Sequence, residues 1–418
     1  MAACSETLPR GCSTICLPIS KESYRGIVDS HRHFRDWLNQ SFRDYPELFP
    51  PAFAQGYTLK DSRTSKKLGL RLRRIECNAT GDAFTVRPSC ALPYMTAWAD
   101  DVEDALFLRR FGVPFWALAK VFGKGPSYWH RLEVGLGRNS IVGTTVRCVD
   151  VPPDLAADEH HQTRNAEKVY ITTVVAQGCC LGACVVDTCD EDALAAGYGV
   201  FRQEARELDP DYSPTTVNLD GWKATRLAWE GLFPVAVVLR CFLHGWLSIR
   251  DGCKKHPQFA ALSEKVWQAY HAGDRRAFAQ RLRRLREWAG RTLTGDILER
   301  TLRLCGRGQE YGRAYEYPDG HRTSATLDRV MRGMNGYFVG CQHLHGSDEA
   351  SDLHVRAWAL LHNFAPWSPQ AQRANDDWHS PAERLNQHRY HDSWLHNLLV
   401  SASLAGLRRS QPSPQTPG

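Results

Sequence analysis

The fold is decided by two neighbouring stretches, Lys168-Val169-Tyr170-Ile171-Thr172-Thr173-Val174-Val175 and Leu181-Gly182-Ala183-Cys184-Val185-Val186. The first is rich in β-branched residues and the second is apolar, and both features favour strands. Further strands are expected just before them, at residues 215–219 and at residues 235–239, with helices at residues 190–208 and 223–232. Residues 151–250 are therefore expected to run strand, strand, strand, helix, strand, helix, strand, which is an α/β pattern.

Three aspartates lie at related points of this pattern. They are Asp158, after Leu155-Ala156-Ala157; Asp220, in Thr216-Val217-Asn218-Leu219-Asp220-Gly221-Trp222; and Asp328, in Arg322-Thr323-Ser324-Ala325-Thr326-Leu327-Asp328-Arg329. Three strands followed by βαβ units is the order of a ribonuclease-H-like mixed sheet flanked by helices. In that architecture the first strand lies beside the end of the fourth. We therefore expect Asp158 and Asp220 to lie side by side.

Converging carboxylates of this kind point to metal-dependent phosphoryl transfer. They bind two divalent cations about 3.5–4 Å apart, which activate water or a 3′-hydroxyl against a phosphodiester. The acids are far apart in the sequence, so only folding brings them together.

The length and charge of the chain allow several domains and a nucleic-acid partner. At 418 residues, two or three domains are expected. The net charge of +6 is mild, but basic residues cluster in two places: Arg63, Lys66, Lys67, Arg71, Arg73, Arg74, and then Arg275, Arg276, Arg281, Arg283, Arg284, Arg286. Such clusters suit contact with DNA phosphates, although two solvated faces would look the same.

The chain divides into five expected regions. Residues 1–97 form an N-terminal region, helical and polar up to about residue 60, with a small β-element at residues 68–90. Residues 98–150 form a helix-turn-helix region. The α/β catalytic domain comprises residues 151–250 and 320–407, with an all-helical insertion at residues 251–319. Residues 408–418 are rich in Ser and Pro and are expected to be a disordered tail.

The helix-turn-helix interpretation rests on three short helices separated by glycine-containing turns. Gly112 and Gly123 end the first two, and the third begins at Ser127. As a recognition helix, the third would present to DNA Ser127, Tyr128, His130 and Arg131. Packing of three helices without DNA is the alternative.

The cysteines and the N-terminus indicate a cytoplasmic protein. Fourteen cysteines are scattered without a disulfide framework, and Cys179, Cys180 and Cys184 are expected to be small, mostly buried thiols. We find neither an apolar run typical of a signal peptide nor a membrane-spanning stretch. A cytoplasmic, nucleoid-associated location without membrane contact is expected.

The ordered set of these features resembles the DDE/D transposases of bacterial insertion sequences, of the Mutator-like type. The resemblance covers about residues 100–400. It rests on the first two acids, on Phe233-Pro234 after the helix that follows Asp220-Gly221, on Cys241-Phe242-Leu243-His244, and on the stretch around Asp328. It implies that Asp158, Asp220 and Asp328 are catalytic and bind Mg²⁺ or Mn²⁺. Double-stranded DNA, as element ends and target, would be the partner of a homodimer or larger assembly.

One departure from the family concerns the third acid, which is usually glutamate. Aspartate also binds Mg²⁺, but the helix must then approach more closely. Glu383 and Glu310 are the rival residues, and a chain without a third acid would be an inactive copy.

Three further sites allow a functional and a structural interpretation each. Cys241 and His244 are expected on a strand, where residues three apart face opposite sides, so a metal site there is disfavoured. Cys341, His343 and His345 are a minor zinc candidate. Trp222 either stacks on a DNA base or fills the core. A non-transposase ribonuclease-H-like nuclease and a sequence-specific DNA-binding regulator are the alternative functions.

Overall fold

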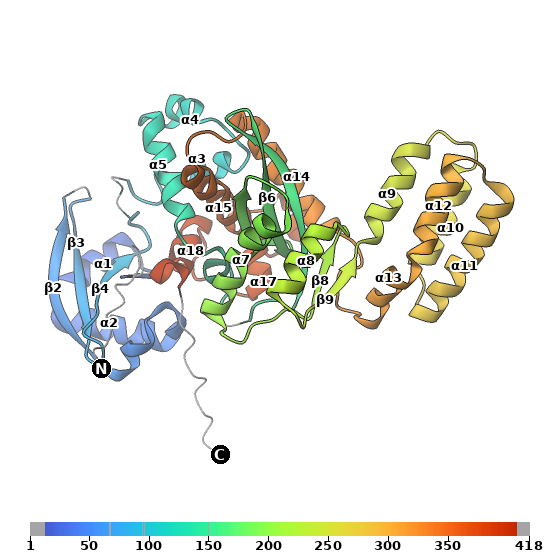
Figure 1. The fold of residues 1–418 in the computed structure, drawn as a ribbon. Coiled ribbons are helices and arrows are strands. Elements are labelled where there is room, and N and C mark those ends of the chain that lie inside the picture. The colour runs from blue at the N-terminus through green and yellow to red at the C-terminus, as the bar shows by residue number, and fades with distance from the viewer. Residues whose placement is uncertain (1–12, 67, 94, 96, 149, 408–418) are drawn as a thin grey trace, which may run out of the picture.

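The computed structural model describes residues 13–66, 68–93, 95, 97–148 and 150–407. The expected disordered tail, residues 408–418, lies outside the described residues. The described chain is α/β, with two sheets flanked by many helices (Figure 1). No helix among these residues is long and apolar enough to cross a membrane.

The N-terminal region is built on a four-stranded sheet. The strands follow the order β1-β4-β3-β2. Their bounds are β1 (Thr14–Leu17), β2 (Tyr57–Ser65), β3 (Leu70–Cys77) and β4 (Ala83–Pro88). The β-element predicted at residues 68–90 is β3 and β4, but the all-helical prediction up to residue 60 is wrong. Helices α1 (Lys21–Val28) and α2 (His31–Asp44) lie between β1 and β2, with short 3₁₀ helices η1 (Pro46–Leu48) and η2 (Pro51–Gln55).

Three helices follow where the sequence predicts them. They are α3 (Glu103–Arg109), α4 (Phe115–Phe122) and α5 (Pro126–Gly137), and a short α6 (Ile141–Thr145) comes next. Gly112 and Gly123 end the first two with positive φ values of 80° and 72°, which glycine adopts without strain. The presence of three helices does not decide their function, so DNA binding by this region stays a prediction.

The central sheet has five strands in the order β7-β6-β5-β8-β9. The pairs β5–β6 and β6–β7 are antiparallel, whereas β5–β8 and β8–β9 are parallel. The bounds are β5 (Asp154–Arg164), β6 (Glu167–Ala176), β7 (Cys179–Val186), β8 (Thr216–Leu219) and β9 (Val237–Arg240). The predicted order of strands and helices in residues 151–250 is therefore present up to β9.

Each face of the central sheet packs against its own pair of helices. Leu155 and Ala157 of β5 join a core with residues of α7 (Glu191–Leu208) and α8 (Lys223–Leu232). Ala156, between them, joins a second core with residues of α14 (Ala325–Cys341) and α15 (Asp348–Phe364). Alternate residues of a strand point to opposite faces, so β5 separates the two cores.

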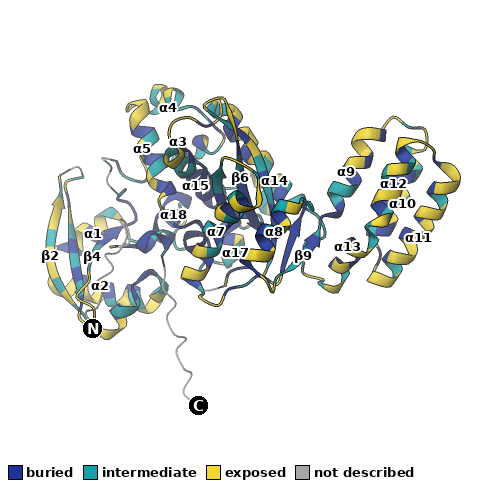
Figure 2. Ribbon diagram, viewed as in Figure 1, coloured by how far each residue is buried: buried dark blue, intermediate teal, exposed yellow. Residues whose placement is uncertain are grey.

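The helical insertion lies to one side of the sheet and has a core of its own (Figure 1). Its helices are α9 (Phe242–Cys253), α10 (Phe259–Tyr270), α11 (Arg275–Thr292), α12 (Asp296–Gly306) and α13 (Gly308–Gly312), with a 3₁₀ turn at η3 (Arg313–Glu316). The insertion was predicted to begin at residue 251. It begins at Phe242 instead, because Cys241 caps α9 and residues 242–244 form the first turn of that helix rather than part of a strand. Figure 2 shows that its outer faces are mostly exposed.

The end of the described chain returns to the N-terminal sheet. Its elements are α16 (Pro369–Arg373), α17 (Pro381–Asn386), α18 (Trp394–Ser401) and η4 (Ser403–Gly406). The Ser403 hydroxyl accepts a hydrogen bond from the Cys16 amide at 3.1 Å and donates one to the Leu48 carbonyl at 2.7 Å. Residues of α18 also share one core with β1 and α1.

A buried ionic network joins the three-helix region to the helices under the central sheet. The Glu133 carboxylate is fully buried on α5 and lies 2.9 Å from Nε of Arg109 on α3. It also accepts a hydrogen bond from the Tyr337 hydroxyl at 2.8 Å and lies 2.8 Å from Nδ1 of His354. Burial alone raises the pKa of Glu133, but Arg109 and His354 lower it to about 2. The network thus holds α3, α5, α14 and α15 together.

Breaking this network is expected to destabilise the protein strongly. Glu133→Gln leaves the Arg109 guanidinium buried without its counter-charge, which costs about 3–5 kcal/mol. Urea denaturation measures the change. The double variant with Glu133→Gln and Arg109→Met should lose less stability than the two single variants added together, because both charges are then removed as a pair.

Glu230→Gln is the matched control, since the exposed Arg226–Glu230 pair on α8 is worth less than about 1 kcal/mol. Equal losses for Glu133→Gln and Glu230→Gln would refute the role given to the network. Because the folded-state pKa of Glu133 is depressed, its contribution is present above its unfolded pKa of about 4.3 and is lost as the pH falls toward 2.

Candidate active site

The pairing of β5 with β8 brings Asp158, in the middle of β5, beside Asp220, which directly follows the C-terminal end of β8. The last paired residues of these two parallel strands are Ala156 and Asn218. Asp158 and Asp220 each lie two residues beyond that pair. Because parallel strands advance at the same rate, the two aspartates lie at the same level on neighbouring segments. The adjacency predicted from the sequence order is thus present in the backbone.

Asp328 approaches these two aspartates from a helix that covers one face of the sheet. Asp158 is two residues after Ala156, so it points to the same face, on which α14 packs. Asp328 lies in the first turn of α14, and one of its carboxylate oxygens accepts a hydrogen bond from the Ser324 hydroxyl at 3.2 Å. All three predicted acids therefore lie near one another, beyond the C-terminal end of β8.

The charges of the three carboxylates act on one another. Burial, together with the negative charge of Asp220 and a smaller effect of Asp328, raises the pKa of Asp158 to about 6. The Glu159 amide and the His244 imidazole oppose these effects. A carboxyl group in this setting keeps a proton up to nearly neutral pH unless a cation offsets the repulsion.

Cys241 and His244 belong to a helix rather than to a strand, which corrects the sequence prediction. Strand β9 ends at Arg240, Cys241 caps α9, and His244 lies in its first turn, so both side chains can face the acids. Nε2 of His244 is 3.9 Å from Oδ2 of Asp158. Interaction with the Cys241 thiol, with smaller contributions from Asp158 and Asp220, raises the pKa of His244 to about 9 against the effect of burial.

Ser324 connects the Cys241 thiol to the third acid. The Ser324 amide donates to the sulfur of Cys241 at 3.2 Å, and the thiol donates to the Ser324 hydroxyl at 3.4 Å. That hydroxyl in turn donates to Asp328. This chain of contacts fixes the start of α14 against the start of α9.

The turn after Asp220 depends on a glycine. Gly221 has a φ of 95°, and a Cβ atom there would overlap the guanidinium of Arg240. The turn lets the Trp222 amide donate to a carboxylate oxygen of Asp220 at 2.6 Å, which orients the carboxylate. Trp222 itself caps α8 and is half-buried. This burial is compatible both with stacking on a DNA base and with filling the core.

Glu159 is a further carboxylate that sequence reasoning missed. It lies next to Asp158 but points to the opposite face of β5, where it accepts hydrogen bonds from the Tyr198 hydroxyl at 2.7 Å and the Thr225 hydroxyl at 2.9 Å. Burial raises its pKa to about 7, although both hydroxyls lower it. Strand alternation could have placed it on the other face, but its partners are far away in the sequence.

The rival third acids are engaged elsewhere. Glu383 is buried on α17, with the His379 amide and Arg389 as its partners. Glu310 pairs with Arg240 at 2.7 Å. Asp328 is the candidate whose charge acts on Asp158.

The residues predicted to contact DNA differ in their exposure. In α5, Ser127 and Arg131 are exposed, His130 is half-buried and its ring lies 5.0 Å from that of His354, and Tyr128 is buried.

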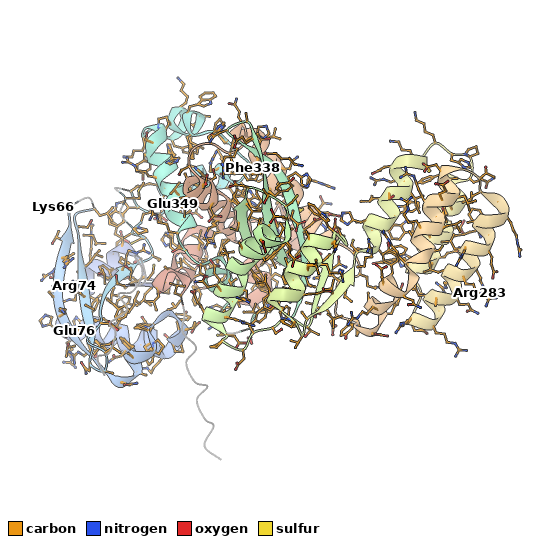
Figure 3. All side chains as sticks on the ribbon, in the orientation of Figure 1. Lys66, Arg74, Glu76, Arg283, Phe338 and Glu349 are labelled. Atoms are coloured by element: carbon orange, nitrogen blue, oxygen red, sulfur yellow. The ribbon has the colours of Figure 1, made fainter. Side chains whose placement is uncertain are left out.

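The two basic clusters lie far from each other. In the N-terminal sheet, Arg73 is buried against the end of α1, whereas Arg71 and Arg74 form ion pairs with Asp29 and Asp61. Figure 3 shows Arg74 and Arg283, one from each cluster, at opposite ends of the molecule.

The minor zinc candidate gains no support from its contacts. Nδ1 of His343 lies 2.6 Å from the Gln162 side chain, and the Cys341 sulfur lies 3.9 Å from the Gly112 carbonyl. Within the described ranges, no group of three or more His, Cys, Asp or Glu side chains is already arranged to hold a metal ion.

Comparison with known proteins identifies no relative of this chain. No family model matches the chain, and no curated protein is significantly similar to it.

Gly221→Ala is expected to destabilise the protein in two separable ways. The left-handed backbone costs about 1–2 kcal/mol for a residue with a Cβ atom, and the overlap with Arg240 adds to this. In an Arg240→Ala background only the backbone part should remain, so the loss measured by urea denaturation should shrink.

Gly231→Ala, at an open position of α8, is the control and should be stabilising by about 0.5–1 kcal/mol. If Gly221→Ala costs as much without Arg240 as with it, the guanidinium does not constrain this turn.

Proposed function

We propose that this chain is a DNA transposase with a ribonuclease-H-like catalytic domain, which cleaves DNA strands at element ends and transfers them to a target. The observation that carries the proposal is the meeting of Asp158, within β5, with Asp220, directly after the end of the neighbouring parallel strand β8, while Asp328 acts on Asp158 from α14. The strand order β7-β6-β5-β8-β9 and the helical insertion after β9 support it.

The donor set fits a hard divalent cation such as Mg²⁺ or Mn²⁺. All three groups are carboxylates, and the mutual repulsion that raises the pKa of Asp158 would be relieved by positive charge. Mg²⁺ retains several water ligands, so one or two carboxylates suffice to hold it, and a complete protein cage is not required. When bound, such a cation would activate the nucleophile and stabilise the leaving oxygen.

The chain itself would supply position and charge. The Trp222 amide orients Asp220, and Ser324 orients Asp328. The contact with the Cys241 thiol raises the pKa of His244, and a protonated His244 would place a positive charge 3.9 Å from Asp158. Holding the reacting groups in fixed geometry is the main contribution that a protein makes to phosphoryl transfer.

A nuclease with the same acids but without strand transfer is the second candidate. The acid cluster favours it equally, since both reactions begin with attack on a phosphodiester. The product therefore distinguishes them, because only a transposase joins the freed 3′-hydroxyl to target DNA.

The first test is cleavage of DNA that carries the element ends, with Mg²⁺ or Mn²⁺. Asp158→Asn, Asp220→Asn and Asp328→Asn should each reduce cleavage by on the order of 100-fold or more, because each change removes a charged ligand at nearly unchanged size. A gel assay of nicked and strand-transfer products gives the readout.

Asp187→Asn, at the exposed end of β7, is the matched control and should retain full activity. Glu383→Gln tests the rival acid and should also remain active. A wild-type protein that binds the DNA but never cleaves it with either metal would contradict the proposal.

A further inference from the structure

A large cavity lies outside the acid cluster, between the N-terminal sheet, α5 and the end of the described chain. Its volume is about 810 Å³, which is within the range of small-molecule and nucleotide sites. Leu92, after β4, Leu136 of α5 and Leu399 of α18 contribute an apolar wall. Three segments that are distant in the sequence thus enclose one space.

The charged residues that line this cavity are all basic. They include Arg87 of β4 and Arg131 and Arg138 of α5, and no aspartate or glutamate of the described chain lines it. Arg131 and Arg138 are exposed, so they extend the positive charge from the cavity to the surface. A cavity with an apolar wall and an excess of arginine suits a ligand that combines a flat apolar group with an anion.

Arg87 is a buried cation in the cavity wall that has no counter-charge among the described residues. Its side chain is only 7% exposed, its Nε atom has no hydrogen-bond acceptor, and it forms no ion pair with any described residue. Among the described residues, its guanidinium donates a hydrogen bond only to the Ala91 carbonyl. The equally buried Arg73, by contrast, donates to carbonyls through both Nε and Nη2. A buried guanidinium without a counter-charge is costly, and an anion in the cavity would offset that cost.

Tyr128 gives a second observation at the same place. It also lines the cavity, and its buried hydroxyl has no hydrogen-bond partner among the described residues. Two lining residues with buried polar atoms that have no partner among the described residues indicate that the cavity is built around a polar ligand rather than around packing alone.

We propose that this cavity binds one unpaired nucleotide of a DNA strand, with the phosphate at Arg87 and Arg138 and the base against the apolar wall. Only a base that has left the stack could reach Leu92, Leu136 and Leu399. The identity of the strand rests on the proposed function, whereas the binding itself needs neither the acid cluster nor a cation.

The test is fluorescence anisotropy with a labelled ten-nucleotide single-stranded DNA and the full chain in EDTA. Asp158→Asn serves as the background, so that cleavage plays no part. Arg87→Met and Arg138→Ala should each weaken binding by on the order of tenfold or more, because each removes a charge-assisted hydrogen bond. Arg138 is exposed, so its variant should fold even if Arg87→Met does not.

Arg373→Ala, which removes an exposed arginine of α16 outside the cavity, is the matched control and should bind like the background protein. Equal binding by the Arg138 and Arg373 variants would overturn the proposal. Binding of deoxyadenosine monophosphate without binding of the oligonucleotide would overturn the assignment to a DNA strand. Loss of oligonucleotide binding only in the cavity variants supports the cavity even if the wild type proves unable to cleave DNA, so the two proposals fail separately.

Discussion

The parallel pairing of β5 with β8 is the constraint on which the candidate site depends. It sets Asp158 and Asp220 at one level, each two residues beyond the Ala156–Asn218 pair. A shift of the pairing by one residue would turn the side chains of β5 to the other face and move Leu155 and Ala157 out of their core. The apolar residues of β5 therefore fix the register, and the register fixes the acids. A carboxylate pair that would repel in isolation is held in place by packing that involves neither charge.

The same alternation assigns different surroundings to adjacent acids. Asp158 faces α14 and the start of α9, whereas Glu159 faces α7 and α8, where two hydroxyls hold it. The position of α14 matters most for the site, because Asp328 reaches Asp158 only if that helix is seated correctly. Its far end carries Tyr337, which belongs to the buried network of Arg109 and Glu133. Ser324 and Cys241 tie its near end to α9. The helix is thus fixed at both ends, one by ionic and one by neutral contacts.

The sequence predicts those parts of the fold that local pattern determines. The bounds expected for α8 match the structure, and the strands around residues 168–186 lie where their composition places them. The misses concern elements that depend on distant partners. Strand β1 has only four residues and exists because β4 pairs with it in parallel. The sequence predicts Cys241 and His244 on a strand, as part of the Cys-x2-His stretch that resembles the family motif, and only the packing of Phe242 in the insertion core shows that a helix begins there. The adjacency of Asp158 and Asp220 follows from strand order, but the approach of Asp328 depends on how α14 docks, which no local pattern encodes.

The buried carboxylates of the site destabilise the fold when they are ionised. The pKa values of Asp158 and Glu159 are raised to about 6 and about 7, chiefly by burial, so the folded chain binds more protons than the unfolded chain at mildly acidic pH. Stability contributed by these two groups is therefore present below their unfolded pKa values of about 4 and falls as the pH rises through their folded values. A protein selected for stability alone would replace such carboxylates with apolar residues, as it does at Leu155 and Ala157 on the same strand. The retention of Asp158 within β5, beside Asp220 after the end of β8, fits a ligand of opposite charge, which would bind the folded, ionised form and restore the lost stability. The buried guanidinium of Arg87, which has no counter-charge among the described residues, likewise fits a ligand of opposite charge. That ligand would be an anion in the cavity.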